Sequence, residues 1–337
     1  MKDNLCVKAP LRIDVGGTWD LKAFALPFEH LKPTTVNIAL DLPVTLNLSW
    51  RDDNLIVISD GDSCIETNLE QVDFRSSFGL LLAICSRYQC DGFTLDIDCT
   101  VPPRNGLGGS GAIAAAFIYA ITECRGHRQS LPDVAMSVHD IEEGLRYSHC
   151  GLQDQCASIY GGVHQWAWHY GRATPFTRTT LMGVGDYAQI SNRLLVAYLG
   201  RGHGSDINQQ QVDSLYDPRT RSKWFEINDN TERAARHIEK SEWGALADCI
   251  NTENQIRLSV VPERLAVEAE PLYRSALSLS AGFGIAGAGA GGCVFAFLED
   301  PAKLDDLADI WAGILQSIDD SKIFLRPGIS CNGVEVK

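Results

Sequence analysis

The first half of the chain contains short segments in which apolar and polar residues alternate, as in β-strands with one buried face. The first covers residues 5–17 and places Leu5, Val7, Leu11, Ile13 and Val15 on one side. Two further strands are predicted at 34–40 and 44–50, with Leu42-Pro43 as the break between them. The same pattern predicts strands at 55–59 and 93–99, and further strands are predicted at 163–170, 194–199 and 293–298.

Helical spacing appears between these strands. An alanine-rich helix is predicted from residue 112 to Gly126, and another opens at Pro132-Asp133. On the second helix, the geometry turns Glu142 toward the protein and Glu143 toward water. Further helices are predicted at 78–87, 224–238, 243–251, 262–277 and 302–318. This order of strands and helices indicates an α+β arrangement rather than a regular βαβ repeat.

A stretch rich in Thr, Gly and Asp at 176–190 is the best candidate for a boundary between two lobes. The length of 337 residues is comfortable for two packed lobes. We therefore expect an N-terminal lobe at 1–180 and a C-terminal lobe at 181–337.

A glycine-rich loop at 101–111 lies between the strand at 93–99 and the alanine-rich helix. Backbone N–H groups gather at such a helix N-terminus and attract anions, phosphate above all. A tight turn into a buried helix would explain the same glycines. Residues 106, 108 and 111 also satisfy G-x-G-x-x-G formally, but no second strand follows the helix, which argues against a dinucleotide fold. No G-K-[ST] follows any glycine cluster, so a Walker loop is excluded.

Composition and net charge limit the kinds of partner that the protein can bind. The formal net charge is −14, from 29 Lys and Arg against 43 Asp and Glu, and this disfavours nucleic acid and anionic membranes. The N-terminal residues lack the apolar core of a signal peptide, so we expect a cytoplasmic protein. The 11 cysteines are odd in number and irregularly spaced, which favours reduced thiols. His149, Cys150 and Cys156 lack a convincing zinc-ligand spacing.

Some candidate residues also have ordinary structural explanations. Asp154 could cap a helix over 155–160, and Asp14 could cap a turn. Trp166 and Trp168 fit core packing better than a binding platform.

Three ordered motifs nevertheless resemble the GHMP kinase family, the small-molecule kinases that include galactokinase, homoserine kinase and mevalonate kinase. They are Ala-Pro-Leu-Arg-Ile-Asp-Val-Gly-Gly at 9–17, the loop at 102–112, which is similar to P-x-x-x-G-L-G-S-S-A, and Gly-Ala-Gly-Ala-Gly-Gly-Cys at 287–293. The resemblance spans nearly the whole chain.

The resemblance implies a role for each residue that matches a motif. Asp154 becomes the catalytic carboxylate with Arg12 as its partner, and Ser110 and Glu142 become ligands of Mg²⁺. The triphosphate of ATP would lie on Pro102, Asn105, Gly106, Leu107, Gly108, Gly109, Ser110, Gly111 and Ala112. The sugar acceptor would contact Asp20, Asp14, Gly151, Gln153, Arg201, His203 and Gly289. Arg201 and His203 belong to a second glycine-rich loop at 200–205, for which a solvated turn is an equal explanation.

Departures from the family pattern concern the acceptor more than catalysis. Residues 16–20 read Gly-Gly-Thr-Trp-Asp where galactokinase has Gly-Glu-His-Thr-Asp, which argues against galactose. The run Cys-Gly-Leu-Gln-Asp-Gln at 150–155 is more similar to the G-x-Q-D-Q of heptose phosphate kinases. Gly109-Ser110-Gly111 replaces the commoner double serine, and Gly284 stands where many members carry a lysine.

The resemblance thus implies a two-lobed α+β kinase, with an N-terminal lobe like ribosomal protein S5 domain 2 and a ferredoxin-like C-terminal lobe. It implies transfer of the γ-phosphoryl group of MgATP to a sugar or sugar phosphate, with the anomeric hydroxyl of a heptose phosphate as first candidate. Galactokinase-like or cyclitol acceptors are the alternative, and a homodimer is left open. From other classes, a non-catalytic sugar sensor and a nicotinamide oxidoreductase are also considered.

Overall fold

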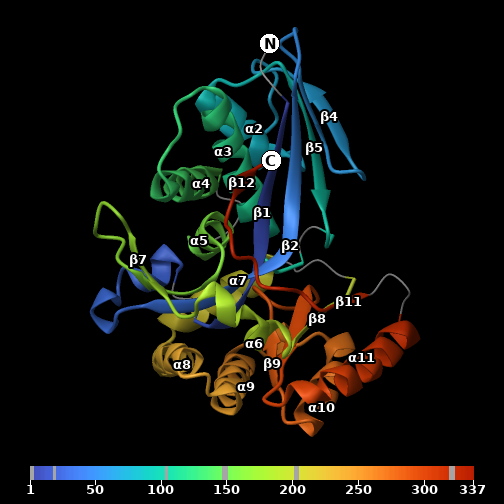
Figure 1. Ribbon diagram of the computed structural model, residues 1–337. Helices are drawn as coiled ribbons and strands as arrows, with labels where there is room; N and C mark the ends of the chain where they lie inside the picture. The colour runs from blue at the N-terminus through green and yellow to red at the C-terminus, as the bar shows by residue number, and fades with distance from the viewer. Residues whose placement is uncertain (1–3, 18–19, 103–104, 146–150, 201–204, 319–322) are drawn as a thin grey trace.

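The computed structural model describes residues 4–17, 20–102, 105–145, 151–200, 205–318 and 323–337. Figure 1 shows two lobes, each built on its own sheet, and this two-lobed α+β arrangement is the one predicted. His149, Cys150, Arg201 and His203 lie outside the described residues. Every cysteine within them is a free thiol.

The first sheet has the strand order β12-β1-β2-β5-β3-β4, and β6 and β7 extend it from β2. Only the β3–β5 pair is parallel among the described pairs of this sheet. The helices α2, α3, α4 and α5 lie on one side of it (Figure 1). The bounds of these elements are β1 (Leu5–Gly16), β2 (Thr34–Trp50), β3 (Ile56–Ser59), β4 (Cys64–Thr67), β5 (Phe93–Cys99), β6 (Val163–Trp168), β7 (Phe176–Thr180), β12 (Glu335–Val336), α2 (Gly79–Tyr88), α3 (Gly109–Cys124), α4 (Leu131–Leu145) and α5 (Gln153–Tyr160).

The predicted break at Leu42-Pro43 is wrong, because β2 is one continuous strand of 17 residues. Its register against β1 shifts at this point, from Pro10 opposite Pro43 to Leu11 opposite Leu40. The first part of β2 pairs with β6 and the second part with β5. Proline lacks the N–H that a regular ladder needs, and a bulge accommodates it without ending the strand.

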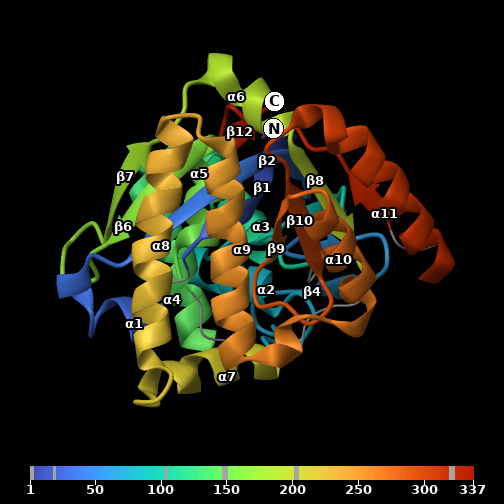
Figure 2. The ribbon, with the colours of Figure 1, turned by 90° about the horizontal axis from the view of Figure 1, so that it is seen from below.

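The second sheet is antiparallel, in the order β11-β8-β10-β9. Alternate residues of β8 enter two different cores: Leu195 and Ala197 pack with α10 and α11, whereas Leu194 and Val196 join the larger core. Figure 2 shows α8 and α9 side by side; α8 packs on β1 and β2 of the first sheet, and α9 packs on β1 and on β9 of the second. The bounds are β8 (Leu194–Tyr198), β9 (Gly282–Ile285), β10 (Cys293–Phe297), β11 (Ile323–Leu325), α8 (Arg221–Glu239), α9 (Trp243–Val260), α10 (Glu270–Ser278) and α11 (Leu304–Ile318).

The remaining elements are short. Two 3-10 turns occupy the first part of the helix predicted at 262–277, so its α-helical part is α10 alone. No helix among the described residues is long and apolar enough to cross a membrane. The other bounds are α1 (Lys22–Ala25), α6 (Tyr187–Ser191), α7 (Ser205–Tyr216) and the 3-10 helices Glu29–Leu31, Val184–Asp186, Pro262–Arg264, Val267–Ala269 and Pro301–Lys303.

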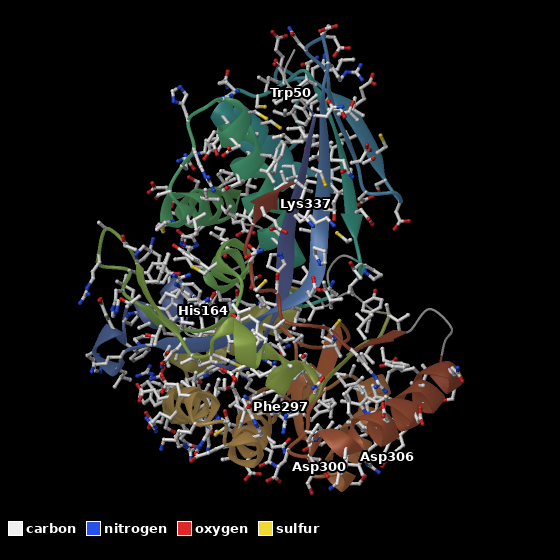
Figure 3. All side chains as sticks on the ribbon, viewed as in Figure 1. Trp50, His164, Phe297, Asp300, Asp306 and Lys337 are labelled. Carbon is white, nitrogen blue, oxygen red and sulfur yellow. The ribbon has the colours of Figure 1, made fainter. Side chains whose placement is uncertain are left out.

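The C-terminal segment returns to the first lobe. Figure 3 labels Lys337 beside the first sheet, where its backbone N–H donates to the carbonyl of Cys6 at 2.9 Å. The backbone N–H of Gly162 donates to Ser330 at 2.7 Å. The division of the chain into lobes at residue 180 stays a prediction. β12 lies after this position in the sequence but pairs with β1 in the first sheet.

We predict that Gly333→Ala destabilises the protein, because a Cβ there would overlap the backbone carbonyl of Ile159 at the end of α5. Backbone cannot move aside as a side chain can, so the loss should be about 2 kcal/mol. The control is Gly313→Ala in α11, where a Cβ has nothing within 4 Å. Urea unfolding measures both, and equal stability of the two variants would contradict the prediction.

Candidate functional site

A cavity of about 770 Å³ lies where the two lobes meet, and it brings together most of the predicted site. Its lining includes residues of the first strand, the glycine loop, α4, α5, α7 and the third glycine motif at 287–293. The predicted residues that line it are Arg12, Asp20, Pro102, Asn105, Gly106, Gly108, Gly109, Ser110, Glu142, Gly151, Gln153 and Asp154.

Hydrogen bonds of the Asn105 side chain within the glycine loop stabilise the conformation of the loop. The side chain of Asn105 accepts from the N–H of Leu107 at 2.6 Å and donates to the carbonyl of Pro102 at 2.8 Å. Gly108 precedes α3 with a φ of 80°, a conformation that favours glycine. The first N–H groups of α3 therefore remain without helical partners beside the cavity, as an anion site requires.

The third glycine motif packs directly on this loop. The N–H of Cys293 donates to the carbonyl of Asn105 at 2.6 Å. Gly287 adopts a φ of 59°, and a Cβ there would lie 2.9 Å from the carbonyl oxygen of Gly106. Two backbones can approach this closely only because neither carries a side chain at the contact. The C-terminal lobe thereby fixes the position of the loop.

Arg12 is buried, with 3% of its surface exposed, and its guanidinium joins three segments. Its Nη1 donates to the carbonyl of Gly106 at 2.6 Å. Its Nε and Nη2 both donate to Oδ1 of Asp154, at 2.9 and 2.5 Å. Burial opposes the charge of Arg12, but the carboxylates of Asp14 and Asp154 outweigh it and raise the pKa of Arg12.

Asp154 does not cap α5, so the capping interpretation is wrong. The residue before the helix is Leu152, and Asp154 lies within the first turn. Its side chain keeps 31% of its surface exposed. Oδ2 of Asp154 takes no hydrogen bond from the described residues, since both bonds from Arg12 go to Oδ1. One carboxylate oxygen is thus anchored and the other is available in the cavity.

The two glutamates of α4 face as helix geometry predicts. Glu142 lines the cavity and accepts from Nε2 of Gln155 at 2.6 Å, whereas Glu143 is 39% exposed and lies 3.4 Å from Nζ of Lys22. Burial, followed by the nearby charge of Asp154, raises the pKa of Glu142 to about 8. Ser110 is exposed at the cavity wall, so its hydroxyl is accessible.

Another end of the cavity is formed around Asp20, which is 3% exposed. Oδ2 of Asp20 accepts from the N–H of Gln153 at 3.2 Å, and Gly151 packs so closely on this carboxylate that a side chain would not fit. Burial, followed by the charge of Asp154, raises the pKa of Asp20 to about 7. Phe24 contributes an apolar surface beside it.

Two predicted acceptor contacts lie outside this lining. Asp14 borders a smaller neighbouring cavity of about 30 Å³, where its Oδ2 lies 3.4 Å from Nη1 of Arg12. Burial, partly offset by the charge of Arg12, raises the pKa of Asp14 to about 7. Gly289 packs on the backbone of Arg264 with a φ of 93°. Asp14 therefore supports Arg12 from behind, and Gly289 shapes the loop. Leu107 and Ala112 are buried beneath the cavity rather than lining it.

The sequence did not point to two parts of the lining. One is a set of apolar residues, Phe78, Leu81, Ile97, Val101 and Ile323. The other is Gln211 on α7, which lies in no motif. Both come from segments whose position depends on tertiary packing, so no spacing rule indicates them.

Comparison with known proteins identifies the family that this architecture matches. Residues 76–162 match the model described as GHMP kinases N terminal domain, and residues 234–314 match GHMP kinases C terminal. The D-glycero-α-D-manno-heptose 7-phosphate kinase of Campylobacter jejuni is 22% identical over 308 residues, which cover 88% of this chain and 89% of that protein.

Solved structures show the same fold. Lactococcus lactis galactokinase, complexed with galactose, superposes with a TM-score of 0.79 at 13% identity, over 99% of this chain and 95% of that one. A D-glycero-D-manno-heptose 1-phosphate kinase from Bacteriodes thetaiotaomicron gives a TM-score of 0.74 at 14% identity, over 99% and 98%.

We predict that the stability of the ligand-free protein falls as the pH rises from about 5 to about 8. In the folded protein Glu142 keeps its proton up to a pKa of about 8, while the unfolded chain releases it near 4.5, so the stabilising difference is lost across this interval. Thermal unfolding of Glu142→Gln should show a shallower pH dependence than the wild type. Glu143→Gln is the matched control and should keep the wild-type slope; the opposite ranking would contradict the assignment.

Proposed function

The chain belongs to the GHMP kinase family, and on that premise we propose that it transfers the γ-phosphoryl group of ATP to a hydroxyl group of a sugar or sugar phosphate. The pairing of Arg12 with Asp154 beside the glycine loop is the observation that carries this proposal. It combines, in one cavity, a place for phosphates, a fixed positive charge and an available carboxylate oxygen.

The chemistry follows from these groups. The N–H groups at the start of α3 and the guanidinium of Arg12 would oppose the negative charge of the phosphates. Oδ2 of Asp154 would accept the proton of the acceptor hydroxyl while the hydroxyl oxygen attacks the γ-phosphorus. ADP would leave with the electrons of the broken P–O bond. Positioning and charge neutralisation are the main requirements of phosphoryl transfer.

The donor groups of the cavity fit Mg²⁺. This ion prefers oxygen ligands and is held in such sites by one or two side chains together with substrate phosphates. Ser110 and Glu142 would supply the protein oxygens, and both line the cavity. The raised pKa of Glu142 is typical of a carboxyl group without a cationic partner. When bound, the ion would neutralise charge on the phosphates.

For the acceptor, we favour a heptose phosphate. The G-L-Q-D-Q run around Asp154 and the relative from Campylobacter jejuni support this choice. Gly151, Gln153 and Asp20 would contact its hydroxyls, since all three line one end of the cavity. A galactokinase-like or cyclitol acceptor is the alternative within the family, and a non-catalytic sugar sensor is the alternative outside catalysis. A cytoplasmic location and a homodimer stay predictions from the sequence.

An ADP-release assay tests the proposal with D-glycero-α-D-manno-heptose 7-phosphate, D-glycero-D-manno-heptose 1-phosphate and D-galactose. We expect Mg²⁺-dependent turnover, fastest with a heptose phosphate. Omission of Mg²⁺ and omission of the acceptor are the controls. If no sugar is turned over while one of them raises the melting temperature, the sensor alternative replaces the kinase.

We predict that Asp154→Asn lowers kcat by at least about a hundredfold while the affinity for ATP stays near that of the wild type. The amide keeps Oδ1 as an acceptor for Arg12 but cannot take the hydroxyl proton. Asp140→Asn, on the exposed face of α4, is the control for loss of one negative charge. Steady-state kinetics and nucleotide titration measure the two quantities, and a nearly normal kcat would remove Asp154 from the role of base.

A further inference from the structure

Gln211 is a buried amide on α7, with 6% of its surface exposed, and two arginines fix its orientation. Oε1 of Gln211 accepts from Nη1 of Arg257 at 3.0 Å and from Nη1 of Arg264 at 2.6 Å. A guanidinium can only donate hydrogen bonds. If the amide were flipped, its NH₂ group would face the N–H groups of both arginines and no acceptor would be there. The carbonyl oxygen is occupied on both lone pairs, and the NH₂ group must point elsewhere.

The NH₂ group is only partly used. Nε2 of Gln211 donates to the carbonyl of Ile207 at 3.4 Å, which is a long bond, and its other N–H has no partner among the described residues. Gln211 lines the large cavity. An amide with a saturated oxygen and an unused donor at a cavity wall is arranged to donate to a ligand.

The position of α7 places this donor at the acceptor end. Tyr216, at the end of α7, donates its hydroxyl to the carbonyl of Ala23 in α1 at 2.9 Å. The segment just before α1 carries Asp20, and Phe24 within α1 lines the same cavity as Gln211. The carboxylates of Asp20 and Asp154 can only accept from the hydroxyls of a sugar when ionised. Gln211 offers the complementary group.

The two arginines are themselves held by a buried network. Arg257 pairs with Glu253 at 2.8 Å, and Oε2 of Glu253 accepts from the N–H of Gly17 at 3.0 Å. Nη2 of Arg264 donates to the carbonyl of Gly287 at 3.2 Å. The network therefore connects Gln211 to the first and third glycine motifs. Hydrogen bonds from two cations to its oxygen polarise the amide and strengthen its N–H as a donor.

We propose that Gln211 is a specificity-determining residue that donates a hydrogen bond to an oxygen of the sugar acceptor, either a phosphate oxygen or an oxygen common to the sugars. This inference rests on the proposed kinase function. The proposal assigns to α7 a contact that the glycine motifs do not supply. It also explains why the residue between the two arginines is an amide, although a carboxylate would neutralise their charge better.

Gln211→Glu tests the role of the NH₂ group separately from the role of the carbonyl oxygen. The glutamate keeps an oxygen for Arg257 and Arg264, so the fold should be retained, but it offers no N–H to the acceptor. Gln211→Met removes the N–H without adding a charge. Gln210→Glu, on the exposed face of α7, adds the same charge away from the cavity and is the matched control.

We expect both Gln211 variants to raise the KM for heptose 7-phosphate by about tenfold or more, with the KM for ATP unchanged and Gln210→Glu like the wild type. A similar rise with D-galactose assigns the contact to an oxygen common to the sugars, and a rise confined to the heptose phosphates assigns it to phosphate. Melting temperatures establish that Gln211→Glu is folded.

Two results would overturn the assignment while leaving the kinase intact. One is an unchanged acceptor KM in Gln211→Glu, which would make Gln211 a structural partner of the arginines only. The other is a rise in Gln211→Glu but none in Gln211→Met, which would reflect repulsion by the new charge. A wild-type protein that turns over none of the three sugars would instead overturn the proposed function, and this role with it.

Discussion

A buried guanidinium needs an acceptor for each of its donors, and the way Arg12 meets this need organises the site. Its acceptors come from the glycine loop and from α5, segments far apart in the sequence. The neighbouring loop must then pass without a side chain: a Cβ on Gly108 would lie 3.3 Å from Cγ of Arg12 and 3.2 Å from Cγ of Asp154. The glycine that precedes the exposed N–H groups of α3 therefore also makes room for the ion pair. One residue type serves two requirements at the same place.

Around this one cation the protein gathers more negative charge than it can balance. Asp14, Asp20 and Glu142 all have raised pKa values, for which burial is the largest cause. Such crowding is unfavourable for the ligand-free protein and favourable for binding a divalent cation and a polar acceptor, since both would pair with carboxylates whose combined charge Arg12 does not balance. Sites whose chemistry requires charge are commonly less stable than their surroundings for this reason. Gln211 is a further polar group that the ligand-free protein does not fully satisfy, because its buried NH₂ group has an N–H without a partner among the described residues.

The sequence predicted the central elements well, because their patterns are local. The strand at 5–17, the helix after the glycine loop and the two faces of α4 depend on spacing that can be counted along the chain. It predicted Arg12, Asp154 and Glu142 together through motifs, and the structure places all three around one cavity. It failed where tertiary packing decides: at Pro43, which a bulge keeps within one long strand, and at Asp154, whose carboxylate pairs with Arg12 instead of capping its helix. Gln211 could not be foreseen, since its partners Arg257 and Arg264 become neighbours only after folding.

The central claim is that Arg12 and Asp154 act as one catalytic unit. A double-mutant cycle with Arg12→Lys and Asp154→Asn, measured as kcat/KM for phosphoryl transfer to heptose 7-phosphate, tests it most directly. Lysine keeps the charge but cannot reach Gly106 and Asp154 together as the guanidinium fork does. If the two residues form a unit, the double variant should lose little more activity than the worse single variant. Losses that multiply would contradict the account and show that the two residues act independently.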